Sequence, residues 1–129
     1  MSTSEALTEG IRVGVEAEYS PEHSQPSANR WFFLYTITIT NESPETVQLI
    51  SRHWTITDAT GEMEEVRGLG VVGDQPVLEP RESYQYTSGC PLPTPFGSMQ
   101  GSYQFVTSGG SQFNAQVARF ELRDVGAIH

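Results

Sequence analysis

The chain of 129 residues contains no lysine and a single cysteine, Cys90. A lone cysteine cannot form an intrachain disulfide, so the fold has to be held together by its hydrophobic core. The sequence also has no apolar run close to the roughly 20 residues that a membrane-spanning helix needs. Its first residues lack the basic and apolar segments of a signal peptide. We therefore expect a cytoplasmic protein that does not bind membranes.

Positive charge is scarce as well. Seven arginines stand against 16 Asp and Glu residues, which gives a formal net charge of -9. Nucleic acids and anionic lipids are bound through Lys and Arg side chains that replace counterions, so this balance argues against both as partners. A protein partner is compatible with the charge. An exposed edge strand could also pair with a second copy of the chain.

Convincing helical segments are absent, and two-residue alternation is present instead. Apolar residues alternate with polar ones in Ile11 to Tyr19, Arg30 to Thr40, Met99 to Thr107 and Gln112 to Leu122. The last two segments are joined by Ser108 to Ser111, a strong hairpin signal. We predict an all-β fold of seven or eight strands. The spacing favours a two-sheet antiparallel sandwich of immunoglobulin or fibronectin type III kind, with a closed barrel as the alternative.

Other segments refine this prediction. Residues 1–10 are polar and acidic, which predicts a flexible leader before a single domain over residues 11–125. The apolar phase slips by one residue near Ile50 and again near Ala118, and such a slip predicts either a β-bulge or a change of strand partner. Three prolines between Cys90 and Gly97 predict an irregular segment.

The segment from Gly68 to Gly73 has the spacing G-x-G-x-x-G of a dinucleotide-binding loop. In such sites the loop opens a helix whose first amides hold a pyrophosphate. Pro76 and Pro80 prevent a helix here, so we interpret the match as accidental.

Three interpretations of this glycine-rich segment stay open. Its glycines could simply permit a long connection at the end of the sandwich. The amides of Gly68, Gly70 and Gly73 could instead form an anion-binding nest, supported by Arg67 or Arg52, and bind pyrophosphate-containing nucleotides. Finally, an apolar loop on an acidic protein could contact another protein. The apolar members are Leu69, Val71 and Val72.

Arg52 and Trp54 form a second candidate site. Their spacing places both on one face of a strand and His53 on the other. Arg beside Trp can stack and is common at binding hot spots, whereas a Trp on a central strand usually fills the core. In the core interpretation, Arg52 covers the edge of Trp54 or pairs with an acid. Our candidate binding residues are thus Arg52, Trp54, Gly68, Leu69, Gly70, Val71, Val72 and Gly73.

We predict no catalytic residues, no metal site and no cofactor. The three histidines lack the spacing of metal ligands, and Cys90 has no histidine near it in the sequence.

Several motifs in fixed order resemble the ApaG family of small bacterial proteins. They are Arg52-x-Trp54, Asp58-x-x-Gly61, Gly68-x-Gly70-Val71-Val72-Gly73-x-Gln75-Pro76-x-Leu78-x-Pro80, Tyr86-x-Ser88-Gly89 and Leu92-x-Thr94-x-x-Gly97-x-Met99-x-Gly101-x-Tyr103. Arg81 departs from the pattern, since the family usually has Gly there. The resemblance covers about Ile11 to Leu122.

This resemblance implies a fibronectin-type β-sandwich with no established enzymatic activity. It also implies a link to cobalt resistance and magnesium efflux, and related domains occur in F-box and polymerase-delta-interacting proteins. We therefore predict a non-enzymatic protein-interaction module that uses the glycine-rich segment. The alternative is a binder of pyrophosphate-containing nucleotides.

Overall fold

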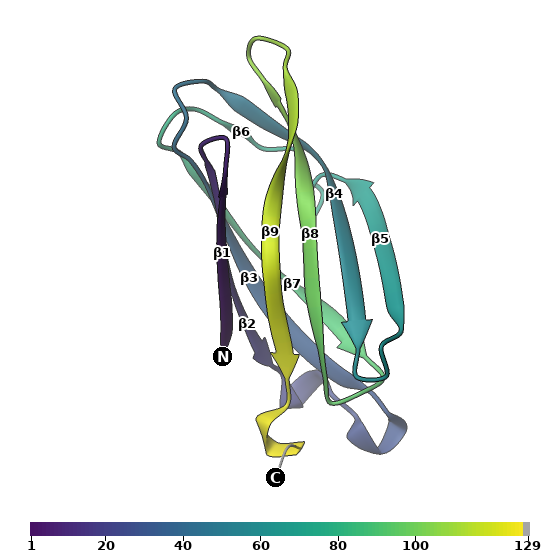
Figure 1. Ribbon diagram of the computed structural model, residues 1–129. Helices are drawn as coiled ribbons and strands as arrows, with labels where there is room; N and C mark the ends of the chain where they lie inside the picture. Colours follow the sequence, from purple (N-terminus) through teal and green to yellow (C-terminus); the bar gives the residue numbers. More distant parts are fainter. Residues whose placement is uncertain (128–129) are drawn as a thin grey trace.

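The computed structural model describes residues 1–127 and shows two antiparallel sheets packed face to face (Figure 1). The first sheet has the order β1 (Ser2–Thr8), β2 (Ile11–Tyr19), β3 (Trp31–Asn41) and β7 (Ser83–Leu92). The second has the order β5 (Met63–Leu69), β4 (Val47–Asp58), β8 (Phe96–Thr107) and β9 (Gln112–Arg123), and the short β6 (Val77–Leu78) also pairs with β4. This arrangement confirms the predicted all-β, two-sheet antiparallel sandwich. Residues 1–127 form nine strands rather than the seven or eight expected, because the segment predicted to be a leader is itself a strand.

Single-turn 3-10 helices supply the remaining regular structure. Two of them, Pro21–His23 and Pro26–Ala28, connect β2 to β3, and Val125–Ala127 follows β9. Within residues 1–127, no helix is long and apolar enough to cross a membrane.

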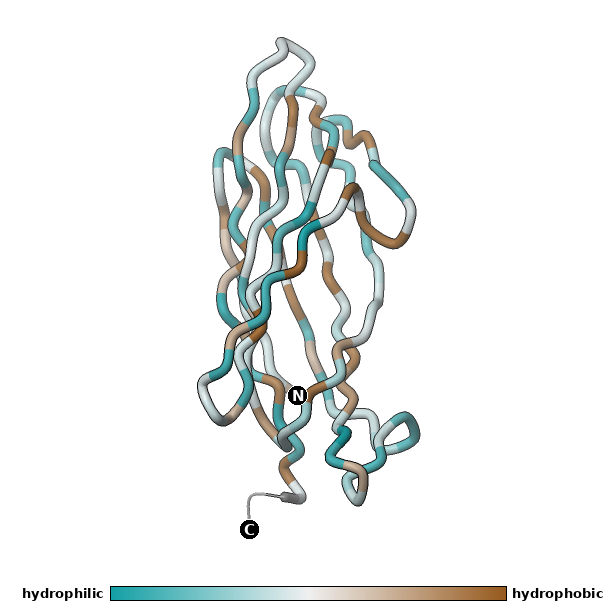
Figure 2. Tube along the Cα trace, turned by 90° about the vertical axis from the view of Figure 1, so that its right-hand side faces the viewer, coloured by the Kyte–Doolittle hydropathy of each residue, from teal (hydrophilic) through white to brown (hydrophobic). Residues whose placement is uncertain are grey.

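The core lies between the two sheets because inward and outward side chains alternate along the strands. Figure 2 shows this alternation as hydrophobic and hydrophilic segments that follow each other along the trace. The largest fully buried side chains include Phe33, Tyr103, Phe105 and Phe120. Burying a Phe side chain contributes about 1.5–3 kcal/mol, so this cluster accounts for much of the stability of the sandwich.

Two bulges lie where the apolar phase slips. In β4 the register with β8 shifts between Leu49 and Ser51, and in the pairing of β8 with β9 it shifts between Met99 and Gly101, opposite Ala118. Both predictions are confirmed. The bulge in β4 reverses which side chains face inward, so that Trp54 is buried while His53 lies on the outer face.

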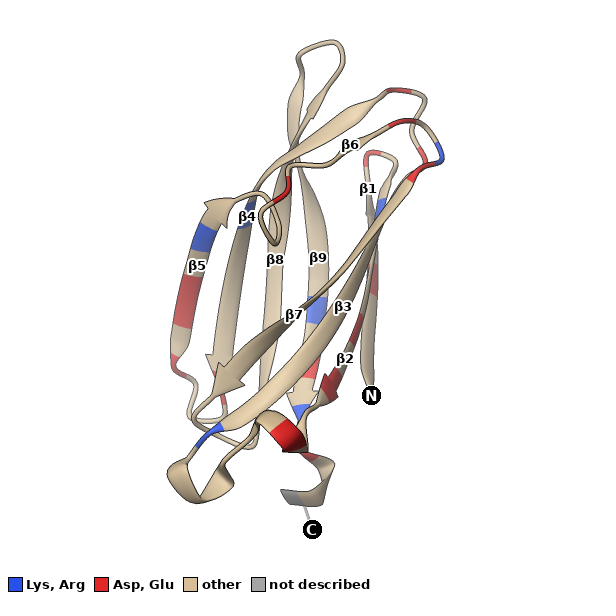
Figure 3. Ribbon diagram, turned by 180° about the vertical axis from the view of Figure 1, so that it is seen from behind, with Lys and Arg blue, Asp and Glu red and all other residues tan. Residues whose placement is uncertain are grey.

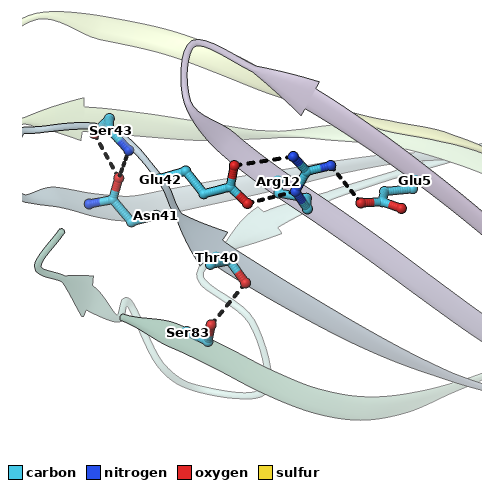
Figure 4. Close-up of polar contacts among 7 residues, drawn as sticks. All are labelled: Glu5, Arg12, Thr40, Asn41, Glu42, Ser43 and Ser83. Carbon is cyan, nitrogen blue, oxygen red and sulfur yellow. Dashed lines mark hydrogen bonds and ion pairs between the residues drawn. The ribbon is translucent and has the colours of Figure 1, made fainter. Parts of the chain in front are cut away.

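The predicted flexible leader is wrong, because Ser2–Thr8 forms β1, which pairs along its full length with residues 11–17 of β2. Side chains also attach β1 to its surroundings (Figure 4): the Arg12 guanidinium donates to Glu5 at 2.7 Å and to Glu42 at 2.6 Å. On its other side, the Ser4 hydroxyl donates to the Ala118 carbonyl. These contacts use backbone and polar groups. The strand therefore has no apolar alternation from which it could be predicted.

Figure 4 also shows how the turn between β3 and β4 is fixed. Asn41 is fully buried, and its side-chain oxygen accepts hydrogen bonds from the backbone amide and hydroxyl of Ser43. Its amide nitrogen donates to the carbonyls of Glu45 and Leu78. A buried amide with all of these partners holds the turn in one conformation.

The prediction of an irregular segment from Cys90 to Gly97 is also wrong at both ends. β7 continues through Cys90 and Pro91 to Leu92, and β8 begins at Phe96. A proline is tolerated there because β7 is an edge strand, whose outer backbone groups have no ladder partner to lose.

Candidate interaction site at the end of β5

The structure brings the candidate residues of the two motifs together. Gly68 and Leu69 are the last residues of β5 rather than part of a loop, and Gly68 lies opposite Arg52 on β4. The chain then turns through Gly70, Val71, Val72 and Gly73 toward β6. The site is therefore the end of a strand pair and the turn that follows it.

Arg52 supports this turn from the inside of the sandwich. Its Nη1 donates to the carbonyl oxygens of Leu69 at 3.1 Å and Gly70 at 2.9 Å. A Cβ atom at position 68 would lie 2.8 Å from the Arg52 Nη2, so glycine at 68 makes room for the guanidinium. Arg52 thus binds backbone carbonyls. From the sequence we expected it to cover the edge of Trp54 or to pair with an acidic side chain.

Trp54 belongs to the core. It is 3% exposed and makes edge-to-face contacts with Tyr35, Tyr103 and Phe120 at centroid distances of 5.7, 6.0 and 6.0 Å. Such contacts are worth about 0.5–1.5 kcal/mol beyond the area they bury. Of the two interpretations of Trp54, the core interpretation describes the structure, so this side chain presents no surface to a ligand.

Val71 is buried rather than exposed, which corrects the prediction of an apolar loop at that position. Its amide donates to the Asp74 carbonyl at 2.8 Å, and the Asp74 amide donates back to Val71 at 2.9 Å. The Tyr84 hydroxyl on β7 donates to the Asp74 carboxylate at 2.9 Å. Val71 therefore anchors the turn in the core, and Tyr84 links the turn to the first sheet.

The Gly70 amide is used within the fold, because it donates to the Ile50 carbonyl at 2.8 Å. Gly70 has a φ of +63°, and a Cβ atom there would lie 2.3 Å from the Asp74 carbonyl oxygen. The glycine is thus needed for a left-handed backbone and a close approach. The anion-nest interpretation requires an outward-facing amide at this position, and the structure directs that amide to Ile50.

Three exposed apolar side chains surround the turn. Leu69 is 74% exposed, Val72 58% and Val77 56%. Leu69 pairs with Ser51 and Val77 with Gln48, so both lie along the same edge of β4. We call Leu69, Val72 and Val77 the apolar edge patch. Val77 was not a candidate from the sequence, where nothing shows which of Val77 and Leu78 faces outward.

Val72 also has an unfavourable backbone conformation, with a φ of +43°. For a β-branched residue the left-handed region is a genuine outlier, because its Cβ lies too close to the following carbonyl oxygen. The fold therefore holds an exposed valine where glycine or asparagine would be more stable.

Comparisons with known proteins identify the family. The family model of the ApaG domain matches residues 21–107. The chain belongs to the ApaG family. It is 56% identical to Protein ApaG of Methylorubrum extorquens (strain PA1) over 117 residues, which cover 91% of this chain and 90% of that protein. Protein ApaG of Thiobacillus denitrificans is 51% identical over 119 residues, which cover 92% of this chain and 94% of that protein.

Solved structures agree with this assignment. The ApaA protein of Bordetella pertussis superposes with a TM-score of 0.85 at 50% identity, covering 88% of this chain and 92% of that one. The C-terminal domain of wzt, at 8% identity, has a TM-score of 0.55 and covers 94% of this chain and 77% of its own. This second likeness shows only a shared fold. The ApaG resemblance read from the motifs is confirmed.

Two further groups of this ApaG-family chain bear on its chemistry. Burial raises the pKa of the Cys90 thiol to about 12, so the sulfur stays protonated at neutral pH. The hydroxyls of Tyr86 and Tyr103 form a hydrogen bond with each other in the core, and burial raises the pKa of both. Within residues 1–127, no group of three or more His, Cys, Asp or Glu side chains is placed to hold a metal ion.

Proposed function

We propose that this ApaG-family chain is a cytoplasmic, non-enzymatic protein-interaction module that binds its partner through the apolar edge patch. The observation that carries the proposal is Val72, which is 58% exposed at a φ of +43°. A strained backbone and an exposed apolar side chain both cost free energy in the isolated protein. Strain of this kind is typical of ligand-contacting segments, and a bound partner that buries the side chain would offset part of the cost.

The surroundings of Val72 suit a binding surface. Arg52 holds the carbonyls of Leu69 and Gly70, and Val71 fixes the turn in the core. The patch is therefore presented on a rigid support, which lowers the entropy lost on binding. β5 is the edge strand of its sheet, so the backbone beside Leu69 is also accessible to a partner.

The family is associated with cobalt resistance and magnesium efflux. In this proposal the chain affects these processes indirectly, by binding a partner protein. The apolar side chains of the patch would fill pockets on that partner, as central apolar residues do at protein interfaces.

Affinity capture with the purified protein as bait tests the proposal. Leu69→Ser and Val72→Asn reduce the patch, whereas Met63→Ser removes an equally exposed apolar side chain, 70% exposed, from the opposite end of β5. We expect wild type and Met63→Ser to recover the same partner and both patch variants to lose it. Circular dichroism should show that all four proteins are folded. Equal recovery by all four would exclude the patch as the binding surface.

A further inference from the structure

A polar hollow lies on the outer face of the second sheet, beside the apolar edge patch. Its volume is about 450 Å³. It is lined by residues from four strands, which are Ser51, Arg52 and His53 of β4, Arg67, Gly68 and Leu69 of β5, Ser102 and Gln104 of β8 and Asn114 of β9. Small-molecule sites have volumes of roughly 300–1,000 Å³, so the hollow is large enough for a ligand of sugar size.

The residues that line this hollow differ in composition from the acidic molecule as a whole. Within residues 1–127, no Asp or Glu lines it, although the chain has 16 of them. An adjoining hollow of about 420 Å³ shares His53 and Ser102, adds Arg119 and likewise has no Asp or Glu among its described lining residues. Figure 3 shows arginine segments on β5 and β9 of this sheet, together with acidic segments on the same two strands. The outer face thus offers a local site for an anion.

Glu65, at the margin of the hollow, shows that a carboxylate can lie beside His53 and Arg67. Its carboxylate lies 2.9 Å from the His53 Nε2 and 3.6 Å from the Arg67 Nη2. The contact with His53 lowers the pKa of Glu65, as expected for a carboxylate that is stabilised in its charged form. The distance to Arg67 is longer than a hydrogen bond, and the Arg67 side chain is 72% exposed. Its planar guanidinium can therefore still take a bidentate oxyanion.

Neutral polar groups in the hollow are already held in place. The Ser51 hydroxyl donates to the Gln104 side-chain oxygen at 3.0 Å, and the Gln104 side-chain nitrogen donates to Gln112 at 3.2 Å. Side chains fixed in this way lose little entropy when they bind a ligand.

We propose that the hollow binds a small polar molecule that carries one carboxylate or phosphate group. Arg67 and His53 hold the oxyanion. Gln104, Asn114 and Ser51 bind hydroxyl or amide groups on the body of the ligand. The hollow adjoins the protein-interaction surface and shares Leu69 with the apolar edge patch, and Arg52 and Gly68, which support the patch, also line the hollow. The inference does not depend on the proposed function.

Nuclear magnetic resonance of the full chain tests this inference, because the side-chain amides of Gln104 and Asn114 and the Nε–H of Arg67 report on the hollow directly. Glucose 6-phosphate and glucuronate carry the two oxyanions on a hydroxyl-rich body, inorganic phosphate carries the anion alone, and glucose carries the body alone. We expect saturable shifts of these three side chains with glucose 6-phosphate, glucuronate or both, weaker binding of inorganic phosphate, and no shifts with glucose.

Variants of single charges give opposite expected effects. Arg67→Gln should weaken binding at least about tenfold, because a charge-assisted bidentate contact is lost. Glu65→Gln removes the internal carboxylate and should tighten binding about threefold. Arg30→Gln removes the same charge from an exposed position just before β3 in the other sheet and should change nothing.

The inference is overturned if no oxyanion gives saturable shifts at millimolar concentration, or if Arg67→Gln binds as well as wild type. Shifts spread evenly over all arginines would show non-specific ion pairing and would overturn it too. Val72 does not line the hollow, so loss of partner capture by Val72→Asn bears only on the proposed function. The two ideas therefore fail separately.

Discussion

Replacing Val72 with asparagine should make the isolated protein more stable. The left-handed backbone at φ +43° costs a β-branched residue about 1–2 kcal/mol, and asparagine tolerates this region. The valine side chain is 58% exposed, so losing its remaining contacts should cost only about 0.5–1 kcal/mol. These two terms allow a net stabilisation of about 0–1.5 kcal/mol. We expect the middle of this range, about 0.5–1 kcal/mol, or a Tm increase of roughly 2–5 °C in a domain of this size.

Val77→Asn is the matched control. Val77 is 56% exposed and lies in the ordinary extended backbone of β6. The same substitution there loses a similar apolar contact and some β propensity but relieves no strain, so it should destabilise the protein by about 0.5–1 kcal/mol. The two variants should therefore differ by about 1–2 kcal/mol, which measures the strain at Val72.

Urea denaturation provides the measurement, because the buried Trp54 should change its fluorescence on unfolding. The expected result is a higher midpoint for Val72→Asn than for wild type, with an unchanged slope, and a lower midpoint for Val77→Asn. If Val72→Asn is no more stable than wild type, the strain argument fails and the proposed function loses its main support. If Val72→Asn is more stable than wild type but no longer captures the partner, the valine at position 72 lowers the stability of the fold in favour of binding.

Three more predictions concern the surroundings of the site. Gly70→Ala should destabilise the protein by more than about 2 kcal/mol in thermal unfolding, because its Cβ would lie 2.3 Å from the Asp74 carbonyl oxygen at a φ of +63°. Trp54→Ala should cost about 3–5 kcal/mol in urea denaturation, a large share of the 5–15 kcal/mol typical of a domain. The Thr60 hydroxyl and nearby amides lower the pKa of Asp58, so the stability from these contacts is present above the ordinary value of 3.8 and is lost as pH falls through the lower folded value. A carboxyl-carbon titration should show this, and Thr60→Val should return the pKa toward 3.8.

Strands with a buried apolar face were predictable from the sequence. The alternation from Ile11 to Tyr19 gave β2 with its observed bounds, and the single phase slip near Ile50 gave the bulge in β4. β1 escaped prediction because it contributes few apolar side chains to the core and is held by the ladder with β2 and by polar contacts with β9. The extent of β7 through Pro91 depends on its edge position, which is a property of the whole sheet.

For the site, the sequence indicated which segments lie together, but it did not indicate which of their side chains face the core and which face outward. Arg52 and the glycine-rich segment are neighbours in space, as the combined candidate set implies. Whether Val71 or Val72 faces inward depends on the turn that Val71 forms with Asp74, which no local pattern encodes. Of the residues that line the polar hollow, Arg52, Arg67, Gly68 and Leu69 were considered for binding from the sequence. The lining residues from β8 and β9 were missed because they meet the others only through strand pairing.

The bulge in β4 accounts for both surfaces discussed above. Before the bulge, Val47 and Leu49 face the core, and an uninterrupted alternation would continue inward with Ser51 and His53. The extra residue, Ile50, shifts the phase, so Arg52 and Trp54 turn inward instead. Arg52 can then hold the carbonyls of Leu69 and Gly70, which supports the apolar edge patch. The same shift places His53 on the outer face beside Arg67, where it contributes to the polar hollow. One inserted residue thus creates the inner support of one surface and places a hydrogen-bonding side chain, His53, in the lining of the other.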